Sequence, residues 1–417
     1  MNAPYDSRYP SIDDLRERAR RRVPRFIFEF LDGGCNEHVN LRKNTAEIRD
    51  VELRPVYLRQ KGDSSLRTEL FGRVYDAPFG VAPIGLQGLV WPSAPEVLAR
   101  SAVDENLPFI LSTCSTASIE RIGEITGGDF WFQLYNPVDP AMRNDILDRA
   151  AAAGCGVLVI LADVPTFGFR YHDIRNGLAI PPAINVRNVL EMAGSPTWAL
   201  QTLRYGRPTF ATLTKYMPAG LDMKQLGLFM NKTFSGKLSP EMLATIRDRW
   251  KGKLVLKGLA TEEDAGVAVK LGLDGIIVSN HGGRQLDAGQ SAIRSLVPIV
   301  RAYAGRIKIM FDSGIRSGPD IARVLASGAE FVFLGRGFMY GVAALGKEGG
   351  RHTISILKTQ LSQVLDQIGC ERIEDLPRHL VRNEGERLYA PGLARLMRTA
   401  IQGNHDTGIN PDDEHDR

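Results

Sequence analysis

Eight short apolar runs alternate with segments of helical spacing along this 417-residue chain, and this alternation strongly restricts its fold. The runs are residues 79–84, 109–112, 130–134, 156–162, 254–256, 275–278, 307–311 and 331–334. The helical segments are residues 96–105, 119–125, 141–152, 241–250, 262–271, 292–302 and 320–326. Such alternation indicates βαβ units and a parallel sheet. Eight units favour an α/β fold closed into a (β/α)8 TIM barrel, and no GxGxxG sequence follows the first run to support a dinucleotide-binding sheet.

Other segments flank and interrupt the predicted barrel. Residues 1–55 are expected to form an N-terminal helical segment, in which Ser11 caps a first helix and a second helix starts at Pro24. The barrel would occupy residues 56–380, with a long insertion after its fourth strand at about residues 166–240. Residues 381–417 are predicted to be a C-terminal extension with a disordered polar tail.

The insertion mixes aromatic and basic side chains, and loops of this length are usually lids or binding elements. One interpretation places residues 190–235, approximately, on an anionic membrane surface. The alternative is that the insertion packs its aromatic side chains against its own barrel or a neighbouring subunit.

Composition describes an ordinary protein with 43% hydrophobic and 24% charged residues. The 52 basic and 48 acidic residues leave a net charge of +4, which is too small to indicate nucleic-acid binding. The four cysteines show no CxxC spacing, so neither a disulfide framework nor a metal site is expected, and a cytoplasmic location fits. No apolar stretch is long enough to span a bilayer.

Polar residues that can do chemistry follow the second to sixth predicted strands. The carboxyl ends of barrel strands meet at one mouth, so residues distant in sequence can share a site there. Each residue alone has an ordinary structural explanation, and their common placement is the argument for function. They are Ser112, Gln133, Tyr135, Asp163, Arg170, Lys257, Ser279, His281 and Arg284.

The last two strands are followed by loops that suit a phosphate group. DSGIRSG follows the seventh strand and GRG follows the eighth. Glycines let backbone N–H groups approach an anion and arginines neutralise it, and this is the usual phosphate position in such barrels. The phosphate could belong to a substrate or to a cofactor.

Several motifs together resemble one enzyme family. SNHGGRQLD, LVLKG, FDSGIRSG, LGRG, FQLY, ADVP and VPRFIFEFLDGG are similar to those of the FMN-dependent α-hydroxy acid oxidases and dehydrogenases. This family includes glycolate oxidase, lactate oxidase, mandelate dehydrogenase and bacterial L-lactate dehydrogenase. The resemblance extends from about Pro24 to Asp375.

The resemblance implies roles for the polar residues in oxidising an L-2-hydroxy acid to a 2-oxo acid. His281 would remove a proton from the substrate, and Asp163 would stabilise the resulting imidazolium. Arg284 and Arg170 would hold the substrate carboxylate through paired hydrogen bonds. Tyr135 would bond the substrate near its reacting carbon.

The resemblance also implies an FMN site and no metal. Lys257 would lie beside the N1–O2 edge of the flavin, where its charge stabilises the reduced ring. Other residues would contact the ring, namely Ser112, Gln133, Ser279 and the backbone of Ala82, Pro83 and Ile84. Asp312 would contact the ribityl chain. The phosphate would meet Gly314, Arg316, Gly335 and Arg336.

Three positions depart from the family pattern. Phe30 stands where a tyrosine usually helps to bind the carboxylate, which removes a hydrogen bond worth about 0.5–1.5 kcal/mol. Leu161 replaces a threonine before the catalytic aspartate, and Cys114 replaces an aromatic residue after the Ser-Thr pair. These changes favour a larger or more apolar 2-hydroxy acid than glycolate or lactate.

Two features bear on the electron acceptor. The long insertion resembles that of membrane-associated bacterial dehydrogenases, and Gly85 replaces an alanine common in oxidases. Both favour a dehydrogenase that passes electrons to a quinone or a carrier protein, peripherally attached to the inner face of the cell membrane. The alternatives are an oxidase that uses O2, an FMN barrel enzyme acting on a non-standard substrate, and a non-catalytic phosphate-binding protein. The resemblance further implies a homotetramer.

Overall fold

The computed structural model describes residues 5–58, 62–178, 185–218, 223–234 and 238–381. Its strands are β1 (Thr68–Leu70), β2 (Arg73–Tyr75), β3 (Phe79–Val81), β4 (Ile110–Ser112), β5 (Trp131–Leu134), β6 (Val157–Leu161), β7 (Lys253–Leu259), β8 (Gly275–Val278), β9 (Lys308–Asp312) and β10 (Phe331–Leu334). The expected C-terminal tail lies outside the described residues, apart from Val381.

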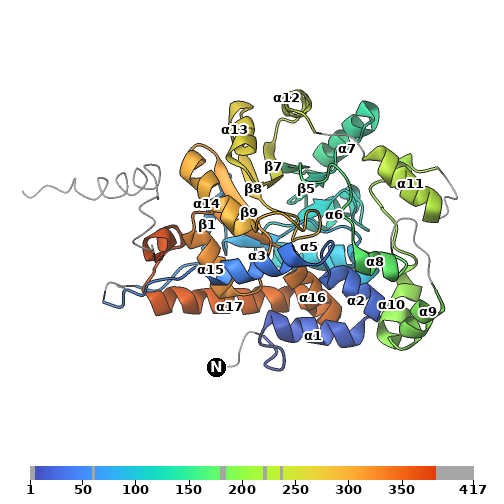
Figure 1. Cartoon of the computed structure of the whole chain (residues 1–417), viewed down its shortest axis with the longest axis horizontal. Helices are drawn as coiled ribbons and strands as arrows, with labels where there is room; N and C mark the ends of the chain where they lie inside the picture. The colour runs from blue at the N-terminus through green and yellow to red at the C-terminus, as the bar shows by residue number, and fades with distance from the viewer. Residues whose placement is uncertain (1–4, 59–61, 179–184, 219–222, 235–237, 382–417) are drawn as a thin grey trace, which may run out of the picture.

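The helices precede, separate and follow these strands (Figure 1). In chain order they are α1 (Ile12–Arg22), α2 (Arg25–Asp32), α3 (Val39–Arg49), α4 (Gln87–Val90), α5 (Ala94–Asp104), α6 (Ile119–Thr126), α7 (Pro140–Ala152), α8 (Tyr171–Arg175), α9 (Val186–Ala193), α10 (Pro196–Tyr205), α11 (Met223–Thr233), α12 (Pro240–Arg249), α13 (Glu262–Lys270), α14 (Ala292–Tyr303), α15 (Gly318–Ala326), α16 (Arg336–Leu345) and α17 (Gly349–Ile368). Three 3-10 helices are η1 (Thr214–Tyr216), η2 (Gly346–Glu348) and η3 (Ile373–His379).

Strands β3 to β10 form a parallel barrel, which confirms the predicted fold. Their order in the sheet is β3-β10-β9-β8-β7-β6-β5-β4. A parallel bridge between Val81 and Phe109 joins the two ends, with the Val81 amide donating to the Pro108 carbonyl at 2.9 Å. All eight predicted strands are present, within three residues of their expected limits at either end.

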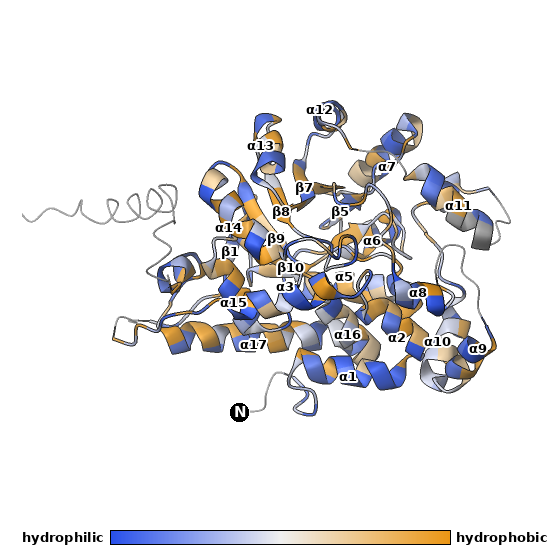
Figure 2. Cartoon of the chain, viewed as in Figure 1, coloured by the Kyte–Doolittle hydropathy of each residue, from blue (hydrophilic) through white to orange (hydrophobic). Residues whose placement is uncertain are grey.

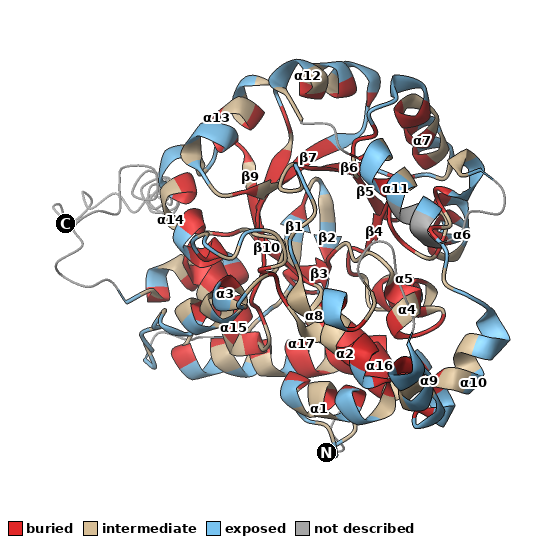
Figure 3. Ribbon diagram, turned by 45° about the vertical axis from the view of Figure 1, so that its right-hand side comes forward, coloured by how far each residue is buried: buried red, intermediate tan, exposed pale blue. Residues whose placement is uncertain are grey.

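The barrel strands are buried on both sides, as their continuous apolar runs require. Figure 3 shows them in red at the centre, inside helices whose outer faces are exposed, and Figure 2 shows the matching apolar residues in β8. The barrel interior is filled by side chains, including those of Ile110, Trp131, Val159, Val255, Ile277, Met310, Phe331 and Phe333. The barrel is therefore a packed core, and its chemistry lies at a mouth.

A two-stranded antiparallel hairpin, β1–β2, was not anticipated from the sequence. Its turn places Phe71 5.7 Å from Trp131, measured between ring centroids, and Tyr75 packs edge-on against Phe331. Because these contacts are with residues near the amino ends of β5 and β10, the hairpin covers the amino end of the barrel. The opposite end is left for the site.

The N-terminal segment contains the two expected helices and one that was missed. The Ser11 hydroxyl accepts from the Asp14 amide at 3.1 Å, and the Asp14 carboxylate accepts from the Ser11 amide at 3.0 Å. This capping box fixes the start of α1, as predicted. The missed helix is α3, whose buried residues are Asn40, Asn44 and Ile48.

The insertion is largely helical, with α8, α9, α10, η1 and α11. Part of it packs on the barrel domain, since Trp198, Phe210, Leu213, Met230 and Phe234 are buried. The Trp198 indole donates to the Val90 carbonyl at 3.0 Å. Within the described residues, no helix is both long and apolar enough to cross a bilayer.

Candidate active site

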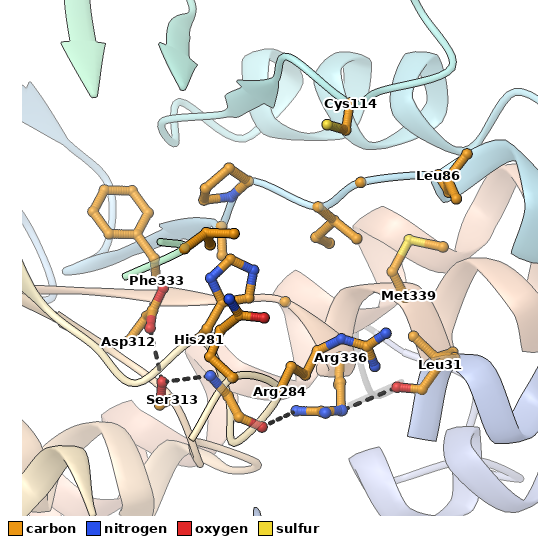
Figure 4. Close-up of a pocket in the computed structure, with 18 of the residues that line it drawn as sticks. Leu31, Leu86, Cys114, His281, Arg284, Asp312, Ser313, Phe333, Arg336 and Met339 are labelled. Atoms are coloured by element: carbon orange, nitrogen blue, oxygen red, sulfur yellow. Dashed lines mark hydrogen bonds between the residues drawn. The ribbon is translucent and has the colours of Figure 1, made fainter. Parts of the chain in front are cut away.

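A cavity of about 220 Å³ opens at the carboxyl end of the barrel strands (Figure 4). The predicted site residues on its wall are Phe30, Ala82, Pro83, Ile84, Tyr135, Arg170, Lys257, His281, Arg284, Asp312, Gly314, Arg316, Gly335 and Arg336. Segments separated by up to three hundred residues therefore meet in one place. The other four predicted residues, Ser112, Gln133, Asp163 and Ser279, lie beside the cavity and not on its wall.

His281 follows β8 and is hydrogen-bonded to Asp163, which follows β6. His281 Nδ1 lies 3.1 Å from Asp163 Oδ1, so the other ring nitrogen, Nε2, is available to a substrate. The close approach depends on Gly258 in β7, which has φ +99°. A Cβ atom at Gly258 would lie 2.5 Å from Asp163 Cγ, so a side chain there would displace the carboxylate.

The Asp163 carboxyl is held in its ionised form, which can stabilise a positive charge on His281. Burial by itself raises the pKa of this carboxyl, but the charge and hydrogen bond of His281, together with the charge of Lys257, outweigh burial and hold the pKa below its ordinary value. Within the described residues, Asp163 Oδ2 has no hydrogen-bond partner. The negative charge of Asp163 is therefore directed mainly at His281.

Two guanidinium groups share the cavity wall with His281. Arg284 Nη1 donates to the Phe30 carbonyl at 2.8 Å and to the Gly33 carbonyl at 2.9 Å, and the Arg284 guanidinium lies over the Phe30 ring, 5.1 Å from its centroid. Arg170 Nη1 pairs with Asp173 Oδ2 at 3.1 Å. Each arginine is thus held by protein groups that use only some of its N–H donors, and the others remain for a carboxylate.

The electrostatics of this wall favour an anion. Burial, and then the charges of Arg170 and Arg336, lower the pKa of Arg284 well below its ordinary value. Burial also raises the pKa of Tyr135 far above its ordinary value, so Tyr135 remains a neutral hydrogen-bond donor. An incoming carboxylate would relieve the repulsion between the guanidinium groups.

Lys257, in β7, lines the cavity, and its side chain reaches toward the carboxyl ends of β8 and β9. Its ammonium lies 2.8 Å from Asp312 Oδ2 and donates to the Ser279 hydroxyl at 2.9 Å. The side chains of Lys257 and Asp312 are only 4% and 9% exposed, so this charge pair is shielded from water. The Ser279 hydroxyl also accepts from the His281 amide at 3.0 Å, which links the lysine to the histidine loop.

The loops after β9 and β10, for which phosphate binding was predicted, both line the cavity through Gly314 and Gly335. Gly314 has φ +90°, and a Cβ atom there would lie 2.6 Å from the Asn44 carbonyl oxygen. Gly335 caps α16, so the first amides of that helix are directed at the same region. Arg316 Nη1 donates to the Ile315 carbonyl at 2.8 Å, and its other N–H groups remain for an anion.

Arg336 differs from the simple expectation of a phosphate ligand. Its side chain donates to three backbone carbonyls, those of Leu31 at 3.0 Å, Gly282 at 2.9 Å and Gly33 at 2.7 Å. Figure 4 shows it bridging the end of α2 and the histidine loop. Burial lowers its pKa to about 10. Arg336 therefore ties two protein segments together and has two N–H groups left for a phosphate.

Sequence reasoning missed several residues of the cavity wall. These are Leu31, Leu86, Val90, Val164, Phe167, Phe210, Met230, Gly282, Gln285, Ser313, Ile315, Phe333, Leu334 and Met339. Gly85 and Cys114, which also line the cavity, were noted from the sequence without being assigned to the site. Most of the missed residues are apolar and carry no chemical signature. Phe210 and Met230 come from the insertion, and only the packing of that segment brings them to the site.

Comparison with known proteins identifies the family. The model of the FMN-dependent dehydrogenase family matches residues 19–383. The L-lactate dehydrogenase of Stenotrophomonas maltophilia (strain R551-3) is 39% identical over 373 residues, covering 89% of this chain and 98% of that protein. The L-lactate dehydrogenase of Xanthobacter autotrophicus is 37% identical over 381 residues, covering 91% and 98%. This chain belongs to the FMN-dependent dehydrogenase family.

Solved structures agree with this assignment. The monotopic membrane protein (S)-mandelate dehydrogenase superposes with a TM-score of 0.85 at 34% identity, over 89% of this chain and 99% of that one. A mandelate oxidase superposes with a TM-score of 0.77 at 33% identity, over 89% and 98%. As a member of the FMN-dependent dehydrogenases, this chain is an oxidoreductase that uses FMN.

The residues present fit FMN. The small and backbone groups at Ala82, Pro83 and Gly85 leave an open wall after β3 on which a flat ring can lie. The buried ammonium of Lys257 supplies a fixed positive charge beside that wall. The loops at Gly314 and Gly335, after β9 and β10, offer backbone amides to a phosphate.

Proposed function

We propose that this enzyme oxidises an L-2-hydroxy acid to the 2-oxo acid, with His281 as the base and Arg284 and Arg170 as the carboxylate clamp. The proposal rests mainly on one observation, that the carboxylate-paired His281 and the two partly engaged guanidiniums face the same cavity. A 2-hydroxy acid carries a removable proton on the carbon that bears its carboxylate, so its oxidation needs a base and a carboxylate-binding group in the same cavity. The L configuration rests on the family resemblance.

In this proposal the protein groups bind, orient and move a proton. Arg284 and Arg170 bind the substrate carboxylate, and Tyr135, kept neutral by burial, donates a hydrogen bond to the substrate oxygen. His281 Nε2 takes a proton from the substrate, and Asp163 stabilises the imidazolium that forms. When bound, FMN supplies the two-electron acceptor chemistry. Lys257 places a positive charge where the reduced cofactor gains negative charge.

An anaerobic reduction experiment tests this function. The purified protein is expected to be yellow and to lose its absorbance near 450 nm, which is roughly the flavin band, when an L-2-hydroxy acid is added without oxygen. His281→Gln should stay yellow without being reduced. If no acid in a broad panel reduces the wild type, the substrate class is wrong. If the glutamine variant is reduced at the normal rate, the base assignment is wrong.

The cavity favours a larger or more apolar substrate than lactate. Phe30 offers no hydroxyl to the substrate, and its carbonyl and ring are engaged with Arg284. Cys114, Leu86 and Met230 add apolar surface to the cavity. Burial raises the pKa of the Cys114 thiol to about 12, so this side chain stays neutral. The mandelate dehydrogenase and oxidase among the structural neighbours are named for an aryl 2-hydroxy acid.

We further propose that the acceptor is a quinone or a carrier protein and that the enzyme attaches peripherally to the inner face of the cell membrane. Helices α9 and α10 lie at the outer edge of the molecule, with much of their surface exposed (Figure 3). We call this the α9–α10 apolar surface, and it consists of Val186, Val189, Leu190, Leu200, Leu203 and Tyr205, with exposed fractions from 53% to 80%. Exposed apolar side chains gathered on two neighbouring helices favour an interaction surface.

The α9–α10 apolar surface overlaps the first part of the segment that the sequence placed on a membrane. The expected segment ran from about residue 190 to 235, and its residues Phe210, Leu213, Met230 and Phe234 are buried. Among the described residues of the insertion, the exposed large aliphatic side chains lie mainly in α9 and α10, with Leu228 of α11 a further one. A structural neighbour described as a monotopic membrane protein supports this assignment.

Two measurements test the acceptor and the assembly. Rapid peroxide formation in air, at a rate comparable to that with an artificial acceptor, would identify an oxidase instead. Light scattering coupled to size-exclusion chromatography tests the homotetramer, which rests on the family resemblance.

A further inference from the structure

Helix α3 presents two buried asparagines to the loop that carries His281. Asn40 and Asn44 are one helical turn apart, so their side chains share a face of α3. Each is only 1% exposed. Both side chains are hydrogen-bonded to the side chain of Asn280, the residue immediately before His281. Asn40 and Asn44 precede Asn280 in the sequence by 240 and 236 positions.

The three amides form a closed hydrogen-bond network. Asn44 Nδ2 donates to Asn280 Oδ1 at 2.8 Å, and Asn280 Nδ2 donates back to Asn44 Oδ1 at 2.7 Å. Asn280 Nδ2 also donates to Asn40 Oδ1 at 2.9 Å. The reciprocal pair fixes the plane of the Asn280 amide, because rotation would break both bonds together.

The same network reaches the rest of the histidine loop. Asn280 Oδ1 accepts from the Gly283 amide at 3.2 Å, and Asn44 Oδ1 accepts from the Ala292 amide at 3.1 Å. Asn40 Nδ2 donates to the Leu286 carbonyl at 2.9 Å, and the Asn40 amide donates to the Asp287 carboxylate at 3.0 Å. Helix α3 therefore holds the loop both before and after His281.

His281 needs such support because its backbone is strained. Its φ of +57° lies in the left-handed region, which costs a residue other than glycine about 1–3 kcal/mol unless its surroundings impose it. The Ser279 hydroxyl accepts from the His281 amide and from Lys257. The neighbouring residue Asn280 is held in place by its hydrogen bonds to α3.

We infer that Asn40 and Asn44 are positioning residues for His281, which act by fixing Asn280 and with it the histidine loop. This inference rests on the proposed role of His281 as the base. Buried amides are a poor source of stability, since each hydrogen bond contributes only about 0.5–1.5 kcal/mol net. A closed amide network instead restricts the loop that it holds to one orientation.

Close packing supports the same role. Gly283 has φ +73°, and a Cβ atom there would lie 2.6 Å from the Leu41 amide nitrogen, so the loop and the first turn of α3 are in direct backbone contact. The Cys35 amide, just before α3, donates to the Gly283 carbonyl at 2.9 Å. A shift of α3 would therefore move the loop.

The test compares Asn44→Leu and Asn40→Leu in the FMN-loaded enzyme with Asn188→Leu as a matched control. Asn188 is also buried, at 2% exposure. Its Oδ1 accepts from the Asn185 amide at 2.9 Å and its Nδ2 donates to the Asn176 carbonyl at 3.3 Å, both within the insertion. Two quantities are measured, the anaerobic rate constant of flavin reduction at saturating substrate and hydrogen–deuterium exchange of the amides in residues 279–287.

We expect the α3 variants to lower the reduction rate by about 10- to 100-fold, as small misplacements of catalytic groups do. Exchange at the Gly282 and Gly283 amides should become faster. The control should lose similar thermal stability and change neither quantity. Asn44→Asp keeps the Oδ1 acceptor and loses the donor to Asn280, so it serves if the leucine variants do not fold.

A folded, FMN-containing α3 variant with a wild-type reduction rate, or with unchanged exchange in residues 279–287, would overturn the inference. The base assignment fails separately, if His281→Gln is still reduced. Exchange measurements would then still report whether α3 holds the loop.

Discussion

His281 Nδ1 and Asp163 Oδ1 lie 3.1 Å apart, although 118 residues separate them in the sequence. Strands β6 and β8 carry these residues to the same mouth, and β7 between them admits the contact because Gly258 has no side chain. The pair defines the direction in which the histidine can accept a proton.

Asp163→Asn should lower the rate of flavin reduction by at least about 100-fold with little effect on FMN binding. The amide cannot stabilise the imidazolium and can donate a hydrogen bond to Nδ1, which would favour the wrong ring tautomer. Stopped-flow reduction and the flavin spectrum measure the two effects. A variant that reduces at more than a tenth of the wild-type rate would remove Asp163 from the proposed mechanism.

Arg284→Lys should lower kcat/KM by about 100-fold and should be more harmful than Arg170→Lys. Lysine cannot bond the Phe30 and Gly33 carbonyls and the substrate carboxylate together, whereas the Arg170 side chain is held, among the described residues, by Asp173 alone. Steady-state kinetics of both variants checks the order. Equal losses would mean that the contacts with α2 do not matter.

Tyr135→Phe should lower activity by a factor that stays constant between about pH 7 and pH 10. An ordinary tyrosine has a pKa near 10, but burial holds the pKa of Tyr135 far above that value. The phenol therefore remains a donor across this range. The ratio of wild-type to variant kcat/KM, measured at several pH values, tests the statement, and a ratio that falls towards one near pH 10 would contradict it.

Cys114→Trp should restrict the substrate range. An indole at the position of Cys114 would fill apolar space beside Leu86 and Met230 in the cavity, and overpacking of this kind typically costs about 1–3 kcal/mol. Turnover of aryl and long-chain 2-hydroxy acids should fall at least tenfold relative to lactate. A variant with an unchanged preference across the panel would show that the substrate side chain lies elsewhere.

Leu200→Asp combined with Leu203→Asp should weaken binding to anionic lipid vesicles without changing flavin reduction. Both leucines belong to the α9–α10 apolar surface, with exposed fractions of 66% and 80%. Leu58→Asp is the matched control, because Leu58 is a fully exposed leucine outside the insertion. Vesicle sedimentation measures the effect, and equal binding by all three proteins would exclude this surface.

Strand positions were accurately predicted because buried parallel strands appear in the sequence as continuous apolar runs. β8, with Ile276, Ile277 and Val278 fully buried, is an example. The polar residue directly after each strand then had to lie at the mouth. For this reason the positions of His281 and Lys257 followed from the sequence once the barrel was recognised.

Helix α3 was missed for the opposite reason. Two of its three buried residues, Asn40 and Asn44, are polar, so hydrophobic periodicity does not reveal its buried face. The hairpin β1–β2 escaped because each of its strands has only three residues and the turn residue, Phe71, is apolar. Short elements of this kind are defined by their tertiary contacts.

The apolar residues of the cavity wall could not be predicted from the sequence either. Phe210 and Met230 lie in an insertion whose path depends on its packing against the barrel domain. Arg336 was expected to hold a phosphate, and no sequence pattern indicated that its side chain would donate to three backbone carbonyls. A contact with a backbone carbonyl does not depend on the residue type that supplies it, so it cannot be recognised in the sequence.

The shared use of the Gly33 carbonyl by Arg284 and Arg336 has a consequence for biosynthesis. Residues 30–44 leave the ribosome early, but their partners at positions 280–336 are made some 240 residues later. At about 5–20 residues per second, this delay lasts on the order of ten seconds or more. The nascent chain must keep this segment available until β8 to β10 emerge, so the catalytic mouth is assembled as one of the last steps of folding.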